Sequence, residues 1–314
     1  MANRTDALEA PAAASTRKSA SLWGDAFRRL LRNRLAVVGG IFVALFVLVA
    51  IFGPMITPFD YRAQDYAVVA EYGGPAPPFV TDHFLGTDNL GRDLLSRLMD
   101  GARISMTVAL VVQIVVLLIG VPVGAAAAWF GGRVDTLLMR FTDIVYAFPD
   151  LLLIILMSVA LRETAFGRAM DGLLVVFVAI GIVAWVGMSR LVRGQLLSLK
   201  ETEFVEAAQA IGVSDFKIVT RHLLPNASGP MIVAVTLGIP GAILAEATLA
   251  FIGIGANAPR ASWGSLITDG QPFLRSEPHL VLFPALAVAI ALISFTFLGD
   301  GLRDALDPKL KGKQ

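Results

Sequence analysis

Long uncharged apolar stretches constrain the fold of this chain more than any other feature of its sequence. Four stretches carry no charged side chain over 18 or more residues: 35–56, 104–130, 172–189 and 280–299. A helix of about 20 apolar residues rises about 30 Å, which is the thickness of the hydrocarbon core of a bilayer. A fifth stretch, 229–259, is longer and contains the acidic residue Glu246. These stretches predict helices that cross a membrane.

A sixth candidate span, 134–161, is less apolar in its first half, which contains Asp135, Arg140, Asp143 and Asp150. Its second half is apolar apart from one serine. None of the six stretches alternates apolar and polar residues, as membrane strands do. The sequence therefore predicts an all-α integral membrane protein with six transmembrane helices. We place them at 35–56, 104–130, 134–161, 172–191, 229–256 and 280–302, the third being the weakest.

The composition excludes several other classes of protein. Only 16% of the 314 residues are charged, against about 25% in a soluble domain. Basic and acidic residues nearly cancel, 26 against 25. The net charge therefore says nothing about a polyanionic partner. The long uncharged stretches argue against a soluble enzyme and against a nucleic-acid-binding protein. The chain has no cysteine, and its three histidines show no metal-ligand spacing. We therefore expect no disulfide, no metal site and no cofactor.

The N-terminal region has two parts. Residues 1–21 are rich in alanine and serine, and we expect a disordered cytoplasmic tail. Residues 22–34 place Phe27, Leu30 and Leu31 opposite several arginines, which predicts an amphipathic helix on the membrane surface. The apolar run that follows is too long for a cleaved signal peptide.

Basic residues favour one orientation of the chain in the membrane. Six spans put both termini on the same side. If that side is the cytoplasm, 18 Lys and Arg residues lie inside and 8 lie outside. Cytoplasmic loops are richer in these residues, so we expect both termini in the cytoplasm.

The predicted cytoplasmic segment 190–228 is longer than a simple connection needs. Ser198 and Glu201 have the spacing of a box that starts a helix. Gly212 is placed to end that helix, Ser214 can cap a second one, and Pro225 is expected to stop it. The result is two short helices joined by a glycine elbow. Spacing alone leaves two interpretations open, a helix resting on lipid and an element that docks on a protein.

This elbow resembles the EAA loop of ATP-binding-cassette (ABC) importer permeases. The general pattern is E-A-A, three residues, G, nine residues, I, any residue, L-P. The matching positions are Glu206, Ala207, Ala208, Gly212, Leu224 and Pro225, whereas His222 stands where the pattern has isoleucine.

Three further strings narrow the resemblance. They are HFLGTDNLGRDLLSRLMDGARIS at 83–105, AEATLAFIGIGANAPRASWG at 245–264 and LGDGLRDALDPKLK at 298–311. They are similar to the second, C-type permease subunit of the dipeptide, oligopeptide and nickel group. The resemblance implies the type I importer fold and ATP-driven import of dipeptides or oligopeptides, with nickel chelates or sugars as alternative cargo.

The resemblance also implies partners in the cytoplasmic (inner) membrane. The elbow would be the coupling helix that docks on a cytoplasmic ATP-binding subunit. The complex would contain one or two such subunits. A second homologous permease subunit would complete the pathway. An extracytoplasmic solute-binding protein would face the outer loops 57–103 and 257–279. The sequence contains no G-x-x-x-x-G-K-[S/T] phosphate loop, so any ATPase activity must reside on a separate subunit and the chain itself is not expected to be an enzyme.

Ionisable residues at membrane depth are the candidates for a translocation pathway, because they are costly there and usually face water or a bundle interior. They are Asp143, Asp150 and Glu246. The alternative is that they are structural groups bonded within the bundle, or interfacial in the case of Asp143. Pro240 and Gly241 precede Glu246 and predict a break in the helix there. The small residues at 124–128 suit close helix packing. We expect them to contact the partner permease.

Two other classes of function compete with the importer permease. A secondary transporter driven by an ion gradient would usually show inverted repeats and mid-membrane ion sites, and no clear repeat is present. An intramembrane enzyme would need paired carboxylates, H-E-x-x-H or a nucleophile with a base, and none lies in the spans. Neither alternative explains the elbow.

Overall fold

The computed structural model describes residues 22–256 and 258–307. The predicted tail at 1–21 lies outside these residues. Within them the chain is helical, and its only β pairing is an isolated bridge between Thr87 and Asp93. Five helices are long and apolar enough to cross a membrane: α2 (Arg34–Ile56), α4 (Leu94–Phe130), α8 (Leu173–Lys200), α12 (Ser228–Phe251) and α14 (His279–Leu306). The all-α membrane fold is confirmed.

The sixth predicted span is not a straight helix. It divides into α5 (Gly132–Ala147) and α6 (Asp150–Leu161), which meet at an angle of 86°. Phe148 is extended, and Pro149 follows it directly. Proline has no N–H for the helical ladder and forces the preceding residue out of the helical region. The described chain therefore has five spanning helices, or six if this bent pair is one span.

Several helices extend beyond the predicted spans or run through expected breaks. Helix α4 begins at Leu94 rather than 104, because Asp93 caps it by accepting a hydrogen bond from the Ser96 N–H. Helix α8 continues to Lys200 rather than ending at 191. Helix α12 runs unbroken through Pro240, so the expected break before Glu246 is absent.

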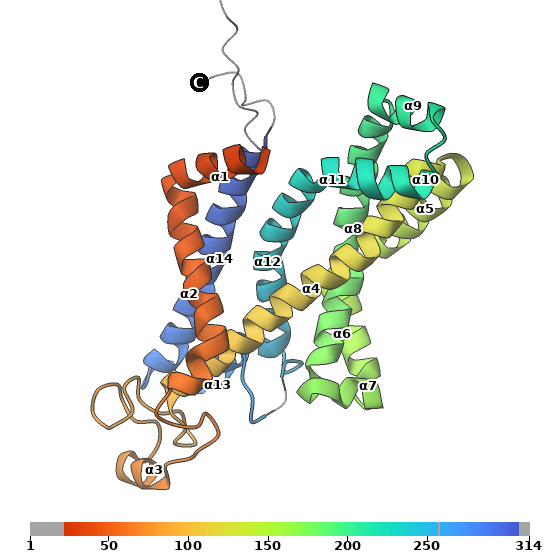
Figure 1. Ribbon diagram of the computed structural model, residues 1–314. Helices are drawn as coiled ribbons and strands as arrows, with labels where there is room; N and C mark the ends of the chain where they lie inside the picture. The colour runs from red at the N-terminus through yellow and green to blue at the C-terminus, as the bar shows by residue number, and fades with distance from the viewer. Residues whose placement is uncertain (1–21, 257, 308–314) are drawn as a thin grey trace, which may run out of the picture.

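The shorter elements lie at the ends of the long ones. They are α1 (Leu22–Arg32), α3 (Tyr66–Tyr72), α7 (Ala165–Arg168), η1 (Ala169–Gly172), α9 (Glu203–Ala210), α10 (Asp215–Lys217), η2 (Ile218–Leu223), α11 (Leu224–Asn226), α13 (Trp263–Gly270) and η3 (Gln271–Phe273). Figure 1 shows α1 and α9–α11 at one end of the molecule, and α3, α7 and α13 at the other end.

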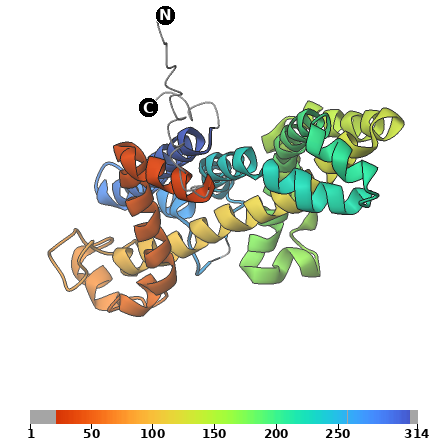
Figure 2. The same cartoon turned by 45° about the horizontal axis from the view of Figure 1, so that its top comes forward.

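Helix α4 crosses the molecule and joins its two parts. It runs obliquely from the side of α2 and α14 to the side of α5 and α8 (Figure 1). Figure 2, with the α1 end turned forward, shows the same helix, in yellow, linking the two groups. Helices α4 and α8 form the most extensive helix pair in the fold.

Glycines allow α4 and α8 to approach closely. A Cβ atom at Gly124 would lie 2.4 Å from the Ser189 carbonyl oxygen, and one at Gly120 would lie 2.7 Å from the Met188 Cβ. The alanines of the 124–128 stretch also pack within this chain; Ala125, Ala127 and Ala128 are nearly inaccessible to solvent. The small-residue face thus serves the α4–α8 contact, and the expected contact with a partner permease is wrong for these buried side chains.

Candidate functional site

The elbow at the end of α8 is built from two short helical segments. The first, α9, begins at Glu203 after Thr202, and Thr202 Oγ1 donates a hydrogen bond to the Leu199 carbonyl oxygen at 2.5 Å. The predicted starting box at Ser198 is therefore wrong. Residues 198–200 still belong to α8, because Leu196 in its last turns is buried and keeps the helix packed against the core.

Gly212 ends α9 as the sequence predicts. Its φ is +78°, in the left-handed region that favours glycine. The Gly212 N–H donates to the Gln209 carbonyl oxygen and the Val213 N–H to the Ala208 carbonyl oxygen, each at 3.0 Å. This pair of bonds is the Schellman closure of a helix C-terminus. The turn is thus fixed by backbone geometry.

The second segment differs from the prediction around Pro225. Ser214 precedes α10, but its side chain forms no capping hydrogen bond. The chain then forms a π-helical stretch, Ile218–Leu223, and stays helical to Asn226. Proline lacks an N–H, and its ring crowds the carbonyl four residues earlier. The wider π turn lies directly before Pro225, so the helix changes its winding there instead of stopping.

One face of the elbow belongs to the main hydrophobic core. Val205, Ala208, Ile218 and Leu223 are buried in the same cluster as Leu196 of α8. The elbow is therefore anchored to the bundle rather than suspended on a loose connection.

The other face is exposed and carries two large apolar side chains among charged and polar ones. Ile211 is 81% exposed and Phe216 is 77% exposed. Of the matched positions, Glu206, Ala207, Gly212 and Pro225 are exposed, whereas Leu224 is half-buried and Ala208 is buried. The six motif residues therefore divide between the outer surface and the core contact.

Polar contacts tie α8 to its neighbours close to the elbow. The Lys200 Nζ donates to the Trp129 carbonyl oxygen at 2.6 Å, at the C-terminal end of α4, and lies 5.2 Å from the centre of the Trp129 ring. Arg193 donates through Nε and Nη2 to the two carboxylate oxygens of Asp135 on α5, each at 2.6 Å. The base of the elbow is thus bonded to both α4 and α5.

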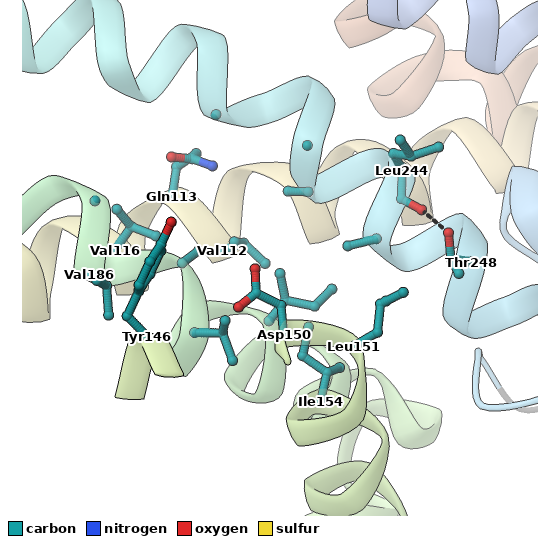
Figure 3. A pocket seen from close by; sticks show the side chains of 18 residues that line it. Val112, Gln113, Val116, Tyr146, Asp150, Leu151, Ile154, Val186, Leu244 and Thr248 are labelled. Atoms are coloured by element: carbon teal, nitrogen blue, oxygen red, sulfur yellow. Dashed lines mark hydrogen bonds between the residues drawn. The ribbon is translucent and has the colours of Figure 1, made fainter. Parts of the chain in front are cut away.

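A cavity of about 500 Å³ lies among α4, α5, α6, α8 and α12. Figure 3 shows it from close by. Most of its wall is apolar, and its polar side chains are Gln113, Tyr146, Asp150 and Thr248. Asp150 is the only charged residue among the 18 that line it. The Thr248 hydroxyl donates to the Leu244 carbonyl oxygen of its own helix at 2.8 Å.

The structure separates the three pathway candidates. Asp150 lines the cavity, whereas Asp143 and Glu246 do not. Asp143 accepts a hydrogen bond from Arg190 at 2.7 Å, and this guanidinium lies 4.6 Å from the centre of the Tyr146 ring.

Glu246 joins helices instead of facing the cavity. It is 1% exposed, and its Oε2 accepts a hydrogen bond from Ser105 of α4 at 3.3 Å. Ser105 Oγ in turn accepts from the Trp263 N–H at the start of α13, also at 3.3 Å. This geometry favours the structural interpretation of Glu246.

A buried polar network at the opposite end of the molecule has no counterpart in the reasoning from sequence. Asp88 accepts hydrogen bonds from Arg92 Nε at 2.7 Å and Arg97 Nη1 at 2.5 Å, and Arg97 Nη2 donates to Asp269 at 3.0 Å. Nearby, His83 Nδ1 lies 3.0 Å from Asp93 Oδ1. These residues connect the loop between α2 and α4 to α4 and α13. Asp88, Arg92, Asp93 and Arg97 all lie in the 83–105 string. That string contributes to the family resemblance, but its residues have no role predicted from sequence.

Asp65, in the loop before α4, is a carboxyl group with a shifted pKa. Backbone N–H groups of Val68 and Ala67 bond to the Asp65 side chain and hold the pKa of that carboxyl below its usual range. Asp65 thereby caps α3. Across residues 22–256 and 258–307, no group of three or more His, Cys, Asp or Glu side chains is placed to hold a metal ion.

Two family descriptions match the chain. Residues 120–312 match the binding-protein-dependent transport system inner membrane component, and residues 21–78 match the N-terminal TM domain of oligopeptide transport permease C. The first match includes the C-terminal end of α4, all of α5, α6, α8 and α12, and the elbow.

Relatives and solved structures agree with this assignment. The oligopeptide transport system permease protein OppC of Bacillus subtilis is 42% identical over 94% of this chain and 92% of its own length. OppC of Escherichia coli is 44% identical over 92% of each chain, and the dipeptide permease DppC of B. subtilis is 41% identical over 94% of this chain and 88% of its own.

A solved structure of the MetNI methionine ABC transporter in an inward-facing conformation shares the fold. Its TM-score is 0.55 at 19% identity, and the match covers 67% of this chain and 96% of that one. The membrane helices, the elbow and these matches together show that the chain belongs to the binding-protein-dependent transport permeases of ABC importers, in the C-type branch of the peptide group.

Proposed function

We propose that this chain is one of two permease subunits through which dipeptides or oligopeptides enter the cell, driven by ATP hydrolysis on separate subunits. The proposal is supported by the relatives, which are named as oligopeptide and dipeptide permeases. A sequence without a phosphate loop needs such an ATPase partner. The cavity of about 500 Å³ has the volume of a small-molecule site. It could form one side of a pathway whose other side is a second permease subunit.

The observation that carries the coupling role is the two-sided elbow. Its inner face is continuous with the core, and its outer face exposes Ile211 and Phe216. Large apolar side chains at the tip of a turn are typical of a surface that a partner covers. An ATPase subunit that holds Glu206, Ala207, Gly212 and the two apolar side chains would move α8 and, through Lys200 and Arg193, also α4 and α5.

The remaining partners follow from the same proposal. A second permease subunit completes the pathway, and an extracytoplasmic solute-binding protein delivers the peptide to the outer loops. Both termini and the elbow face the cytoplasm. This orientation agrees with the 18 to 8 distribution of basic residues and with the position of α1, the end of α14 and the elbow at one end of the molecule (Figure 1).

Coupling is tested in the complete complex, with both permeases, the ATPase subunits and the binding protein in proteoliposomes. Gly212→Val requires a β-branched residue at φ +78°, and Glu206→Lys reverses a charge on the exposed face. We expect both variants to insert and to lose ATP-driven peptide uptake. Gly194→Ala is the matched control, because a Cβ there has nothing within 4 Å. Wild-type uptake by both elbow variants would refute the coupling role.

A further inference from the structure

Asp150, the charged residue in the cavity wall, has no charge partner among residues 22–256 and 258–307. Helices α5, α6, α8 and α12 carry four carboxylates. Asp135 bonds to Arg193, Asp143 to Arg190 and Glu246 to Ser105. Across the described residues, no hydrogen bond or ion pair is formed by the Asp150 side chain. Its carboxylate is turned into the cavity, on the side of Tyr146 (Figure 3).

The position of Asp150 at the start of a helix explains only part of this arrangement. Asp150 is the first residue of α6, where a negative charge interacts favourably with the helix dipole. That interaction makes a carboxylate tolerable at this position. Asp150 is exposed in this chain, so its carboxylate is accessible to a ligand that enters the cavity.

The cavity has room for a ligand beside this carboxylate. Gly187 of α8 and Gly241 of α12 line it, and a Cβ at either position would have nothing within 4 Å. Alanine would be the better helix former at both positions. Glycine there leaves the space next to the apolar walls open, and the Gln113 amide adds groups that can bond to a peptide backbone.

We propose that Asp150 binds a primary ammonium group of the transported peptide, either its N-terminal amine or a lysine side chain. This inference rests on the proposed function. A carboxylate in a mostly apolar wall attracts a cation more strongly than one in bulk water, because the wall excludes part of the solvent. An ammonium group on a flexible apolar ligand matches both the charge and the wall. Arg190 does not compensate Asp150, since it is bonded to Asp143.

The test compares peptides in the reconstituted complex, each at a concentration that saturates the binding protein. The probes are trialanine, N-acetyl-trialanine and an N-acetylated tripeptide that contains one lysine. For the wild type we expect trialanine uptake to exceed N-acetyl-trialanine uptake by about tenfold, as for loss of one charged hydrogen bond. Asp150→Asn should reduce this preference to about twofold or less, and Asp150→Glu should retain it.

The lysine-containing probe distinguishes the two sources of the ammonium group. If the wild type moves it as fast as trialanine, any ammonium satisfies Asp150; if it stays as slow as N-acetyl-trialanine, the site is specific for the N-terminus. An unchanged preference in Asp150→Asn would overturn the assignment of Asp150. Loss of the partner permease from Asp150→Asn complexes would also overturn it, because the carboxylate would then pair with the neighbouring subunit. Failure of the wild type to move any peptide would instead overturn the proposed function.

Discussion

At the scale of single residues, Lys200 connects the base of the elbow to the C-terminal end of α4. Its ammonium group bonds to a carbonyl oxygen at the end of α4 and lies over the Trp129 ring. Cations near a helix C-terminus interact favourably with its exposed carbonyl groups. Nothing in the sequence around Lys200 identifies this role, because the partner lies 71 residues away. Contacts of this kind are visible only in the folded chain.

Lys200→Met should uncouple the complex. Methionine keeps an apolar stem but has no donor for the Trp129 carbonyl oxygen, so the bond between α4 and the end of α8 is lost. A hydrogen bond from a charged donor contributes about 1.5–3 kcal/mol. We expect ATPase activity to persist while peptide uptake per ATP falls several-fold. Lys200→Arg, which keeps charge and donors, should retain coupling. Equal coupling ratios for the methionine variant and the wild type would contradict this role.

Gly124 should tolerate no branched side chain. A Cβ there would be 2.4 Å from the Ser189 carbonyl oxygen, which is backbone and has little freedom to move. Overpacking of this kind costs about 1–3 kcal/mol. Gly124→Val should therefore lower the thermal unfolding midpoint and the yield of the purified complex. Gly187→Ala, at an unobstructed glycine, should leave both unchanged. A stable Gly124→Val complex would show that α4 and α8 can separate without loss of folding.

At the scale of elements, composition predicted the long helices and local chemistry predicted the glycine turn. The spans follow from apolar length, and the end of α9 follows from Gly212. The start of α9 did not follow from the Ser198 box, because burial of Leu196 keeps α8 helical beyond it. Tertiary packing thus overrode a local signal. The division between Asp150 in the cavity wall and Glu246 in a helix contact also required the structure, since both are acids in apolar sequence.

The α5–α8 contact should depend on the pairing of Arg193 with Asp135 rather than on either charge alone. The two side chains are partly exposed, so the bidentate pair contributes about 1 kcal/mol or less to stability. We expect Arg193→Asp to reduce peptide uptake per ATP, and a second change, Asp135→Arg, to restore much of it. Uptake and ATP hydrolysis measured for the single and double variants check this. If the loss of peptide uptake per ATP in the double variant equals the sum of the losses in the two single variants, the two residues do not act as a pair.

At the scale of the whole molecule, the elbow and a polar network lie at opposite ends of the fold. The elbow and α1 lie at one end, and the polar network around Asp88 and Arg97 lies at the other (Figure 1). Apolar spans and basic residues in the sequence predict this arrangement coarsely. They do not predict that Asp88 joins the loop before α4 to Arg97 of α4 by a buried ion pair. Nor do they predict that Arg97 also pairs with the half-exposed Asp269 of α13, which lies 172 residues away.

The polar network around Asp88 and Arg97 should be needed for folding. Asp88 bonds to two buried arginines, and Asp88→Ala would leave their charges without this partner. Removing one partner of a buried charge pair costs about 3–5 kcal/mol. We expect little folded complex from Asp88→Ala, measured by its yield and its thermal unfolding midpoint. Asp82→Ala, at an exposed carboxylate of the same loop, is the matched control and should remain stable. Wild-type stability of Asp88→Ala would mean that the loop folds without this network.

The absence of cysteine from the sequence allows the orientation of the chain to be tested directly. Single cysteines are introduced at the exposed positions Glu71 in α3, Arg28 in α1 and Ile211 at the elbow. A maleimide that does not cross membranes is added to right-side-out or inverted vesicles. Glu71→Cys should react only in right-side-out vesicles, and Arg28→Cys and Ile211→Cys only in inverted ones. Addition of the ATPase subunits should then protect Ile211→Cys but leave Arg28→Cys reactive. Labelling of Ile211→Cys from the outside would place the elbow beyond the reach of any cytoplasmic ATPase, and the coupling role could not stand.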